Sequence, residues 1–116
     1  MIKWIKKGEC ILITVSGEFD LCMVPEFRDT VDNLIVSNPS VRKLILNLKN
    51  VSFIDSSGLG AIMGRYKKMV SKGGILEIES PSHNATKALL SCGLDKIIDI
   101  YENTDVKSKR SSLGVV

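Results

Sequence analysis

The sequence has few of the residues on which catalysis, disulfide bonding and base stacking depend. It contains one histidine, His83, three cysteines and only 5% aromatic residues. The cysteines, Cys10, Cys22 and Cys92, show no C-x-x-C spacing, so the sequence predicts neither a disulfide framework nor a zinc site. We expect a reducing, cytoplasmic environment in which Cys10 and Cys92 are thiols packed among apolar neighbours.

Long apolar runs and DNA-binding signatures are also missing. No segment approaches the roughly 20 apolar residues of a membrane helix, and residues 1–7 alternate too quickly between apolar and charged to form a secretory signal. The net charge is +3, but Lys107, Lys109 and Arg110 cluster beside serines, where a solvated, mobile tail at 107–116 explains them. We therefore expect a soluble protein whose direct partner is neither a membrane nor a nucleic acid.

The remaining sequence alternates between strand-like and helix-like patterns. Strands are predicted at 1–7, 10–15, 44–48, 51–54, 75–79 and 97–101, and helices at 25–37, 59–72, 82–92 and 102–109. Strands that alternate with helices favour a parallel sheet, and the opening hairpin adds an antiparallel strand. The fold class expected for a single domain over 1–116 is therefore α/β, with one small mixed, mostly parallel β-sheet and flanking helices. In the helix at 59–72, Arg65 is expected on the polar face together with the lysines.

The segment Asp55-Ser56-Ser57-Gly58-Leu59-Gly60 is the most informative one in the chain. It lies where a predicted strand ends and a predicted helix begins, and a helix N-terminus favours negative charge. One interpretation is that Asp55, Ser56 or Ser57 caps the helix, a role that typically contributes ~1 kcal/mol. The other interpretations are that the segment binds a phosphate or that one of its serines becomes phosphorylated.

Familiar phosphate-binding and hydrolase patterns do not fit this segment. A dinucleotide fingerprint would need a third glycine where Met63 stands, and no Gly-Lys-Ser/Thr follows to complete a P-loop. A serine hydrolase would need a G-x-S-x-G elbow and a histidine base. The elbow is absent, and His83 stands near a predicted helix start, where histidine is more typical of the surface or a cap. We expect no catalytic residue, no cofactor and no metal.

Asp20 ends the second predicted strand, as Asp55 ends a later one. Its simplest role is that of a turn residue or cap before the helix that starts near Pro25. If the parallel strands bring their carboxyl ends to one edge of the sheet, Asp20 and Ser56 share a surface there. Met23 and Met63 are expected mainly in the core, with adaptable contact at this surface as the alternative.

A set of segments spread over nearly the whole chain carries a resemblance to a known family. The segments are Gly17-Glu18-Phe19-Asp20, Leu46-Asn47-Leu48, Val51-Ser52-Phe53-Ile54-Asp55-Ser56-Ser57-Gly58-Leu59-Gly60, Gly64-Arg65-Tyr66-Lys67, Gly73-Gly74, Cys92-Gly93-Leu94 and Lys96-Ile97-Ile98. They resemble the STAS-domain family, specifically the bacterial anti-sigma factor antagonists and most of all the sporulation type that acts on the sigma-F regulator. Leu21-Cys22-Met23 departs from the more polar stretch expected of that family.

The resemblance implies a non-enzymatic protein that binds an anti-sigma factor and thereby frees a sigma factor. It also implies that this partner is a serine kinase using ATP, that Ser56 is the phosphoacceptor, and that a serine phosphatase removes the phosphate. The implied partner-binding residues are Asp20, Asp55, Ser56, Ser57, Gly58, Leu59 and Gly60. The alternative is a STAS-type regulatory module that binds a ligand or nucleotide at the same loop without covalent modification.

Overall fold

The chain folds around a mixed β-sheet. The computed structural model describes residues 1–103, and within them the strands are β1 (Ile2–Lys7), β2 (Cys10–Phe19), β3 (Lys43–Ile54), β4 (Ile75–Glu79) and β5 (Ile100–Tyr101). They lie in the spatial order β1-β2-β3-β4-β5. β1 and β2 form an antiparallel hairpin, whereas β2, β3, β4 and β5 run parallel to one another. The expectation of a mixed, mostly parallel sheet is confirmed.

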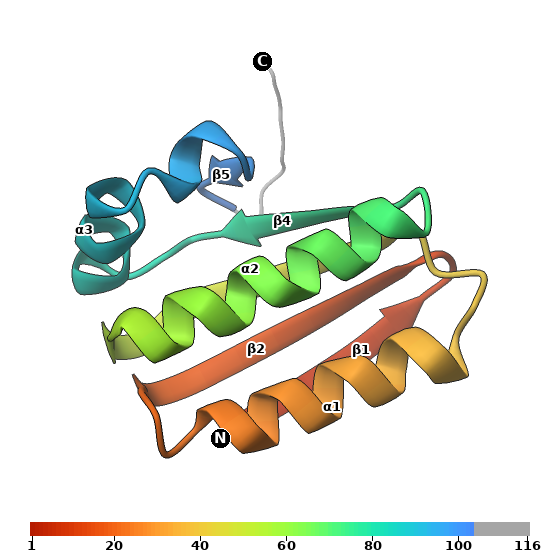
Figure 1. The fold of residues 1–116 in the computed structure, drawn as a ribbon, viewed down its shortest axis with the longest axis horizontal. Helices are drawn as coiled ribbons and strands as arrows, with labels where there is room; N and C mark the ends of the chain where they lie inside the picture. Colours follow the sequence, from red (N-terminus) through yellow and green to blue (C-terminus); the bar gives the residue numbers. More distant parts are fainter. Residues whose placement is uncertain (104–116) are drawn as a thin grey trace.

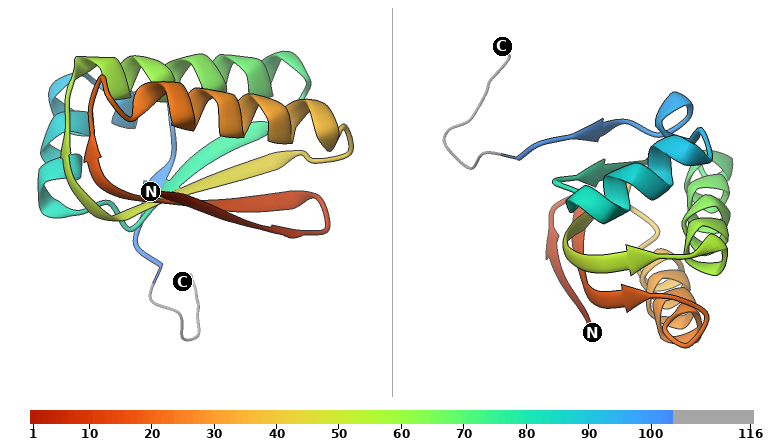
Figure 2. Two further views of the ribbon diagram at one scale, coloured as in Figure 1. Left: turned by 90° about the horizontal axis from the view of Figure 1, so that it is seen from below. Right: turned by 90° about the vertical axis from the view of Figure 1, so that its left-hand side faces the viewer.

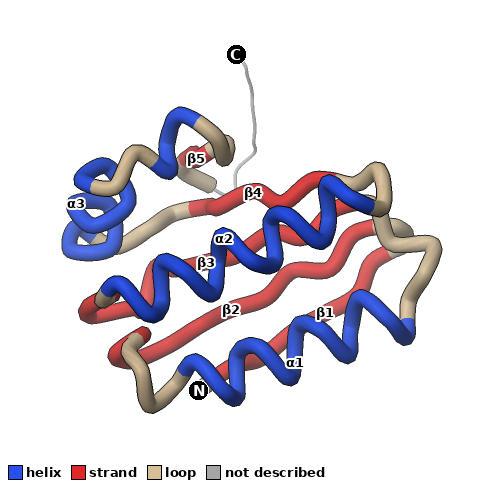
Figure 3. Tube along the Cα trace, viewed as in Figure 1, coloured by secondary structure: helices blue, strands red, loops and turns tan. Residues whose placement is uncertain are grey.

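Within residues 1–103, three α-helices flank the sheet: α1 (Val24–Ser37), α2 (Ser56–Ser71) and α3 (His83–Ser91), with a 3-10 helix η1 (Leu94–Lys96) after them. Figures 1 and 2 show α1 and α2 side by side over one face of the sheet. α3 lies beyond the carboxyl end of β4, and Figure 3 shows that all three α-helices begin at this same end of the molecule. The loops that follow β2, β3 and β4 therefore gather at one edge.

The core lies between the sheet and the helices, chiefly α1 and α2, and it also includes Leu89 of α3 and Ile98 after η1. Successive side chains of a strand point to opposite faces, and the inward-facing set is aliphatic. The largest fully buried side chains are Phe19, Phe27, Ile11, Ile13, Leu44, Leu46, Leu48, Ile62, Met69, Ile78, Leu89 and Ile98. Met23 and Met63 pack against this core as partly buried residues, so the expectation of core packing for both is confirmed.

β2 and β3 are longer than the sequence predicted. The strand expected to stop at residue 15 continues to Phe19, and the runs at 44–48 and 51–54 belong to one strand, β3. The pairing of β2 with β3 shifts register between Thr14 and Ser16 and again near Gly17, whose φ is +100°. Bulges of this kind absorb extra residues without ending the ladder, and for that reason polar and glycine residues do not break the strand.

The carboxyl-terminal part differs from the prediction in another way. The strand expected at 97–101 contains only Ile100–Tyr101, because Gly93 with φ +79° leads into η1 and Ile98 is buried in the core through that turn. Residues 102 and 103 follow β5 without helical structure. The rest of the helix predicted at 102–109 and the tail predicted at 107–116 lie outside the described residues.

The three cysteines carry free thiols. Cys10 is partly buried on β2, and burial raises the pKa of its thiol. Cys92 is exposed at the end of α3, so the expectation of a packed thiol was wrong at that position. Its apolar neighbours Leu89 and Leu94 supply the buried side chains of this region, whereas Cys92 stands at the outward-facing helix end.

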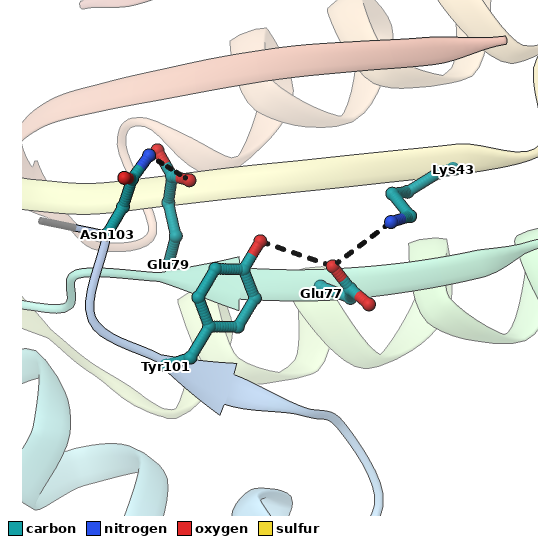
Figure 4. Close-up of polar contacts among 5 residues, drawn as sticks. All are labelled: Lys43, Glu77, Glu79, Tyr101 and Asn103. Atoms are coloured by element: carbon teal, nitrogen blue, oxygen red, sulfur yellow. Dashed lines mark hydrogen bonds and ion pairs between the residues drawn. The ribbon is translucent and has the colours of Figure 1, made fainter. Parts of the chain in front are cut away.

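A polar cluster attaches the short strand β5 to the sheet (Figure 4). The Glu79 carboxylate, 4% exposed, accepts hydrogen bonds from the Nδ2 atoms of Asn47 at 2.8 Å and Asn103 at 3.0 Å. Glu77 accepts a bond from the Tyr101 hydroxyl at 3.2 Å. Burial and the two nearby carboxylates raise the pKa of Tyr101. A buried carboxylate is tolerated where donors satisfy it, so this cluster has a structural role.

An ion pair joins α1 to α2. Asp32 Oδ1 lies 3.1 Å from Arg65 Nε, and Asp32 Oδ2 lies 2.9 Å from Lys68 Nζ. Arg65 is only 6% exposed, so its expected place on the polar face was wrong, although Lys67 is exposed as expected. Asp32 on the facing helix supplies the counter-charge that lets the guanidinium enter the helix interface.

The first turn of α2 packs tightly against the end of β2. Asp55 donates its backbone N–H to the Phe19 carbonyl at 3.3 Å. A Cβ added to Gly58 would lie 2.5 Å from the Phe19 carbonyl oxygen and 2.9 Å from Cγ2 of Ile54, whereas a Cβ added to Gly60 would meet no atom within 4 Å. Glycine at 58 is therefore a packing requirement, and glycine at 60 is not.

Replacing Asp32 with asparagine should lower the free energy of unfolding, because Arg65 would stay buried without its counter-charge. We expect a loss of roughly 1–3 kcal/mol, below that of a fully enclosed pair because solvent reaches Asp32. Urea unfolding followed by far-UV circular dichroism measures it. Asp29, exposed on the same helix, provides the control, since Asp29→Asn should change stability by less than about 0.5 kcal/mol. Equal losses in the two variants would contradict the role of the ion pair.

Alanine at Gly58 and at Gly60 should have opposite effects on stability. Gly58→Ala forces a methyl group against β2 and should cost about 1–3 kcal/mol, as overpacking typically does. Gly60→Ala adds a helix-favouring residue in open space and should raise the free energy of unfolding by roughly 0.5–1 kcal/mol. Denaturant midpoints of the two variants measure the difference. A stable Gly58→Ala protein would show that α2 does not need this close approach.

Candidate functional site

Two adjacent parallel strands bring Asp20 and the segment after Asp55 to the same edge of the sheet. Phe19, the last residue of β2, pairs with Ile54, the last residue of β3. Asp20 and Asp55 are the next residues of each strand, and Figure 1 shows α1 and α2 starting beside each other at this edge. The prediction that Asp20 and Ser56 lie at one edge of the sheet is therefore confirmed.

Asp55 is the residue that caps α2. Its Oδ1 accepts a hydrogen bond from the backbone N–H of Gly58 at 3.0 Å, and its carbonyl oxygen accepts one from the N–H of Leu59 at 3.0 Å. A carboxylate at this position also interacts favourably with the positive end of the helix dipole. The capping interpretation holds for Asp55 alone, because neither serine makes such a bond within residues 1–103.

Ser56 and Ser57 are the first two residues of α2, and their hydroxyls have no hydrogen-bond partner in the described part of the chain. Ser56 is exposed, whereas Ser57 is partly buried. The hydroxyl of Ser56 is thus accessible to an incoming enzyme and is not needed by the fold. A phosphate on it would lie at a helix N-terminus, where negative charge is stabilised.

Asp20 organises the loop between β2 and α1. Its Oδ1 accepts hydrogen bonds from the backbone N–H groups of Cys22 at 3.1 Å and Met23 at 3.2 Å. Its carbonyl oxygen accepts hydrogen bonds from the N–H groups of Met23 at 3.0 Å and Val24 at 3.1 Å. Asp20 is partly exposed, so its simplest predicted role, a turn residue before α1, is confirmed and its carboxylate still contributes negative charge to the edge.

The other predicted residues of the segment differ in what they present to a partner. Gly58 is buried, and Leu59 is partly buried against the core. Gly60 is exposed and has open space around it. Gly58 and Leu59 therefore pack beneath the surface residues, while Ser56 and Gly60 form part of the exposed surface.

Sequence reasoning missed four residues around this edge. Leu21, next to Asp20 in the loop after β2, is 68% exposed, and Phe53, near the end of β3, is 48% exposed, so both leave apolar surface uncovered. Arg28 and Arg65 line a cavity of about 290 Å³ between the beginnings of α1 and α2, together with Leu21, Val24, Ser57, Gly60 and Ala61. The sequence did show that Leu21 is less polar than the family's usual residue. The helical pattern of 59–72, however, predicted Arg65 on the polar face and not in a cavity.

The arrangement does not support hydrolase chemistry. His83 is the exposed first residue of α3, and no hydrogen bond joins it to Ser56 or Ser57 among residues 1–103. Ser82, not His83, caps α3, with its Oγ accepting from the N–H of Ala85 at 3.1 Å. The described residues contain no group of three or more His, Cys, Asp or Glu side chains placed to hold a metal. Over the same residues, no helix combines the length and hydropathy needed to cross a membrane.

Comparison with solved structures shows the same fold in regulatory proteins. The structure of the anti-sigma factor antagonist SpoIIAA in its unphosphorylated form has a TM-score of 0.79 and 25% sequence identity, and the alignment covers 90% of each chain. The Bacillus cell fate determinant SpoIIAA in its phosphorylated form has a TM-score of 0.73 at 24% identity, over 90% of this chain and 93% of that one.

Sequence comparison identifies the family. The STAS domain model matches residues 2–106. The anti-sigma F factor antagonist of Paenibacillus polymyxa is 38% identical over 96 residues, which cover 80% of this chain and 79% of that protein. The anti-sigma-B factor antagonist of Bacillus subtilis (strain 168) is 33% identical over 95 residues, or 82% of this chain and 84% of that one. The chain therefore belongs to the STAS domain family and, within it, to the family of the anti-sigma factor antagonists.

Proposed function

We propose that the unphosphorylated protein binds an anti-sigma factor that is also a serine kinase, and thereby frees a sigma factor. Phosphorylation of Ser56 ends this binding, and a serine phosphatase restores it. The observation that carries the proposal is the exposed Ser56 hydroxyl, which has no partner among the described residues, beside a helix cap that Asp55 already provides. The fold does not require a serine at this position, so its hydroxyl is available for modification.

Charge explains how one phosphate could switch binding without unfolding the protein. A phosphate adds about −1.5 to −2 charges at pH 7. In the free protein the first turn of α2 stabilises this charge and water solvates it. In a docked complex the same charge would be desolvated next to Asp20 and Asp55, and an unpaired charge in an interface is costly. Phosphorylation therefore weakens docking and leaves the fold intact.

The surface around Ser56 suits a protein partner. Leu21 follows Asp20 and lines the same cavity as Ser57, and its large apolar side chain is exposed. Gly60 and Gly64 lie in α2, yet a Cβ on either would meet no atom within 4 Å. Packing does not require these glycines, which each cost helix stability. A partner backbone approaching α2 closely would require them.

The names of the relatives support the proposed function. Two of them are named as antagonists of anti-sigma factors, and SpoIIAA has been solved in forms described as unphosphorylated and phosphorylated. Those names describe the relatives. For this chain they make the anti-sigma factor and the phosphorylation of Ser56 the first hypotheses to test.

Replacing Ser56 with alanine should abolish phosphate incorporation and preserve binding of the kinase. The partner can be recovered by pull-down with this protein, identified by mass spectrometry and purified. Incubation with it and ATP should add one phosphate mass to the parent and to Ser57→Ala, but none to Ser56→Ala. Ser57→Ala is the matched control, because it removes the adjacent hydroxyl of the same helix turn. Continued labelling of Ser56→Ala at the same stoichiometry would contradict the assigned acceptor.

Placing a fixed negative charge at Ser56 should weaken the complex. We expect Ser56→Asp to bind the purified partner at least about tenfold more weakly than Ser56→Ala, because one added charge in a desolvated contact costs a few kcal/mol. Isothermal titration calorimetry measures both affinities. If Ser56→Asp bound as tightly as the parent, the repulsion mechanism would be wrong.

The alternative, non-covalent binding of a ligand or nucleotide at the same loop, makes a different prediction for the same intact-mass experiment. Under that alternative the protein mass stays unchanged after incubation with kinase and ATP, and only reversible binding is detected. Direct modification of Ser56 and non-covalent binding are therefore distinguished in a single measurement.

A further inference from the structure

One face of the sheet has no covering layer over part of its area. α1 and α2 pack on the other face, and within residues 1–103 no helix lies over the open face of β1 and of the first halves of β2 and β3 (Figure 2). Parallel strands are usually covered on both faces. The pairing of β2 with β3 is parallel, so this open face is a candidate for a surface that a second protein covers.

Apolar side chains form a row across the open face. Ile5 of β1 pairs with Leu12 of β2, and Leu12 pairs with Ile45 of β3, so the three residues are neighbours on three adjacent strands. The residues before and after Leu12 and Ile45 are buried in the core, which directs these two side chains to the opposite face. Ile5 is 58% exposed, and the other two are partly exposed. A contiguous apolar group with a polar rim is typical of an interaction site.

Three hollows on this face share lining residues and form one groove. The central hollow, of about 240 Å³, is lined by Ile5, Cys10, Leu12 and Ile45 among others. It shares Cys10 and Ile45 with a hollow of about 440 Å³ that reaches β4. It shares Ile5 and Leu12 with a hollow of about 500 Å³ beside β1. The apolar row is therefore the floor of a groove that can take the side chains of a partner.

The rim of the groove is cationic. Lys3 and Lys7 are exposed on the two sides of Ile5 in β1, and neither has an ion pair within residues 1–103. Lys43, near the start of β3, lies 3.7 Å from Glu77, and its side chain is still 42% exposed. The β1 side of the groove therefore presents positive charge without a counter-charge among the described residues.

Two carboxylates also line the groove, and neither neutralises this charge. Glu79 is 4% exposed and accepts hydrogen bonds from Asn47 and Asn103. Glu9 lies in the turn after β1 and lines the same hollow as the exposed Arg42. The groove as a whole therefore favours an occupant with negative charge.

Charge also decides between the possible occupants. A second copy of the chain would bring the same cations, Lys3 and Lys7, to the face. The chain's own segment after residue 103 includes Lys107, Lys109 and Arg110, so it too would place cations beside cations. A segment that carries carboxylates beside apolar side chains would be attracted to the rim while it covers the row.

We propose that this groove binds an acidic amphipathic segment of another protein. Its apolar side chains lie on the row of Ile5, Leu12 and Ile45, and its carboxylates lie beside Lys3 and Lys7. The groove is formed by the first halves of β2 and β3, whereas the candidate phosphoacceptor follows the last residue of β3. The protein can therefore hold this partner and an anti-sigma factor at the same time.

A synthetic peptide with leucines on one face and glutamates on the other tests the groove. It is added to the full chain while backbone amide shifts are followed by NMR. We expect saturable shifts at Leu12, Ile45 and their neighbours and none in the first turn of α2, with weaker binding as salt screens the rim charges. A matched peptide with lysine for each glutamate should bind at least about tenfold more weakly. Absence of saturable shifts, or equal binding of the two peptides, would overturn the proposal.

Variants of the groove separate specific binding from general attraction. Ile5→Ser and Lys7→Glu change exposed residues, so both should fold normally and each should weaken binding of the glutamate peptide about fivefold. Val36→Ser on α1 and Lys67→Glu on α2 make similar changes at exposed positions of the helices on the opposite face and should leave the affinity unchanged. Equal losses in groove variants and controls would refute the site.

Other occupants would be detected in the full chain without peptide. Amide shifts of Ile5 and Leu12 that grow with protein concentration, together with a dimer in analytical ultracentrifugation, would assign the face to a second copy. Nuclear Overhauser effects between the apolar row and residues 104–116 would assign it to the chain's own segment. Either result would overturn the proposal. Ser56→Asp should bind the glutamate peptide as the parent does, and a changed affinity would contradict the separation of the two sites.

Discussion

The parallel pairing of β2 with β3 determines the position of every other part of the site. Because Phe19 and Ile54 are paired as the last residues of their strands, the loops after them leave the sheet together. The hydrogen bond from Asp55 to the Phe19 carbonyl and the absence of a side chain at Gly58 then bring the first turn of α2 against β2. A longer or differently registered β2 would separate Asp20 from Ser56.

Neighbouring residues of the segment Asp55–Gly60 have different roles. Asp55 satisfies the N–H groups of the helix start, and Gly58 lets the helix approach the sheet. These two structural roles leave the serines free of structural hydrogen bonds within the described residues. A phosphate on Ser56 would therefore change the charge of the surface without removing a contact on which the fold depends. This independence is what a reversible binding switch needs.

The interface between α1 and α2 links this surface to the core. Asp32 holds Arg65 in the interface and also contacts Lys68, so two cations of α2 depend on one carboxylate of α1. Arg28 and Arg65 line a cavity that also includes Ser57 in the first turn of α2, close to the acidic residues at the strand ends. Acidic and basic groups are thus placed on neighbouring parts of one end of the molecule, where they can select a partner by charge as well as by apolar contact.

The sequence by itself determined the alternation of strands and helices, the mixed sheet, the helix beginning near Pro25 and the cap segment before α2. These features follow from local properties: apolar periodicity, the restricted backbone of proline and the capping preference of aspartate. The continuation of β2 to Phe19 depended on bulges, which have no clear local pattern. The position of Arg65 depended on Asp32, more than thirty residues away in another helix. Only the tertiary structure decided such features, because burial and charge pairing arise between segments that the chain brings together after folding.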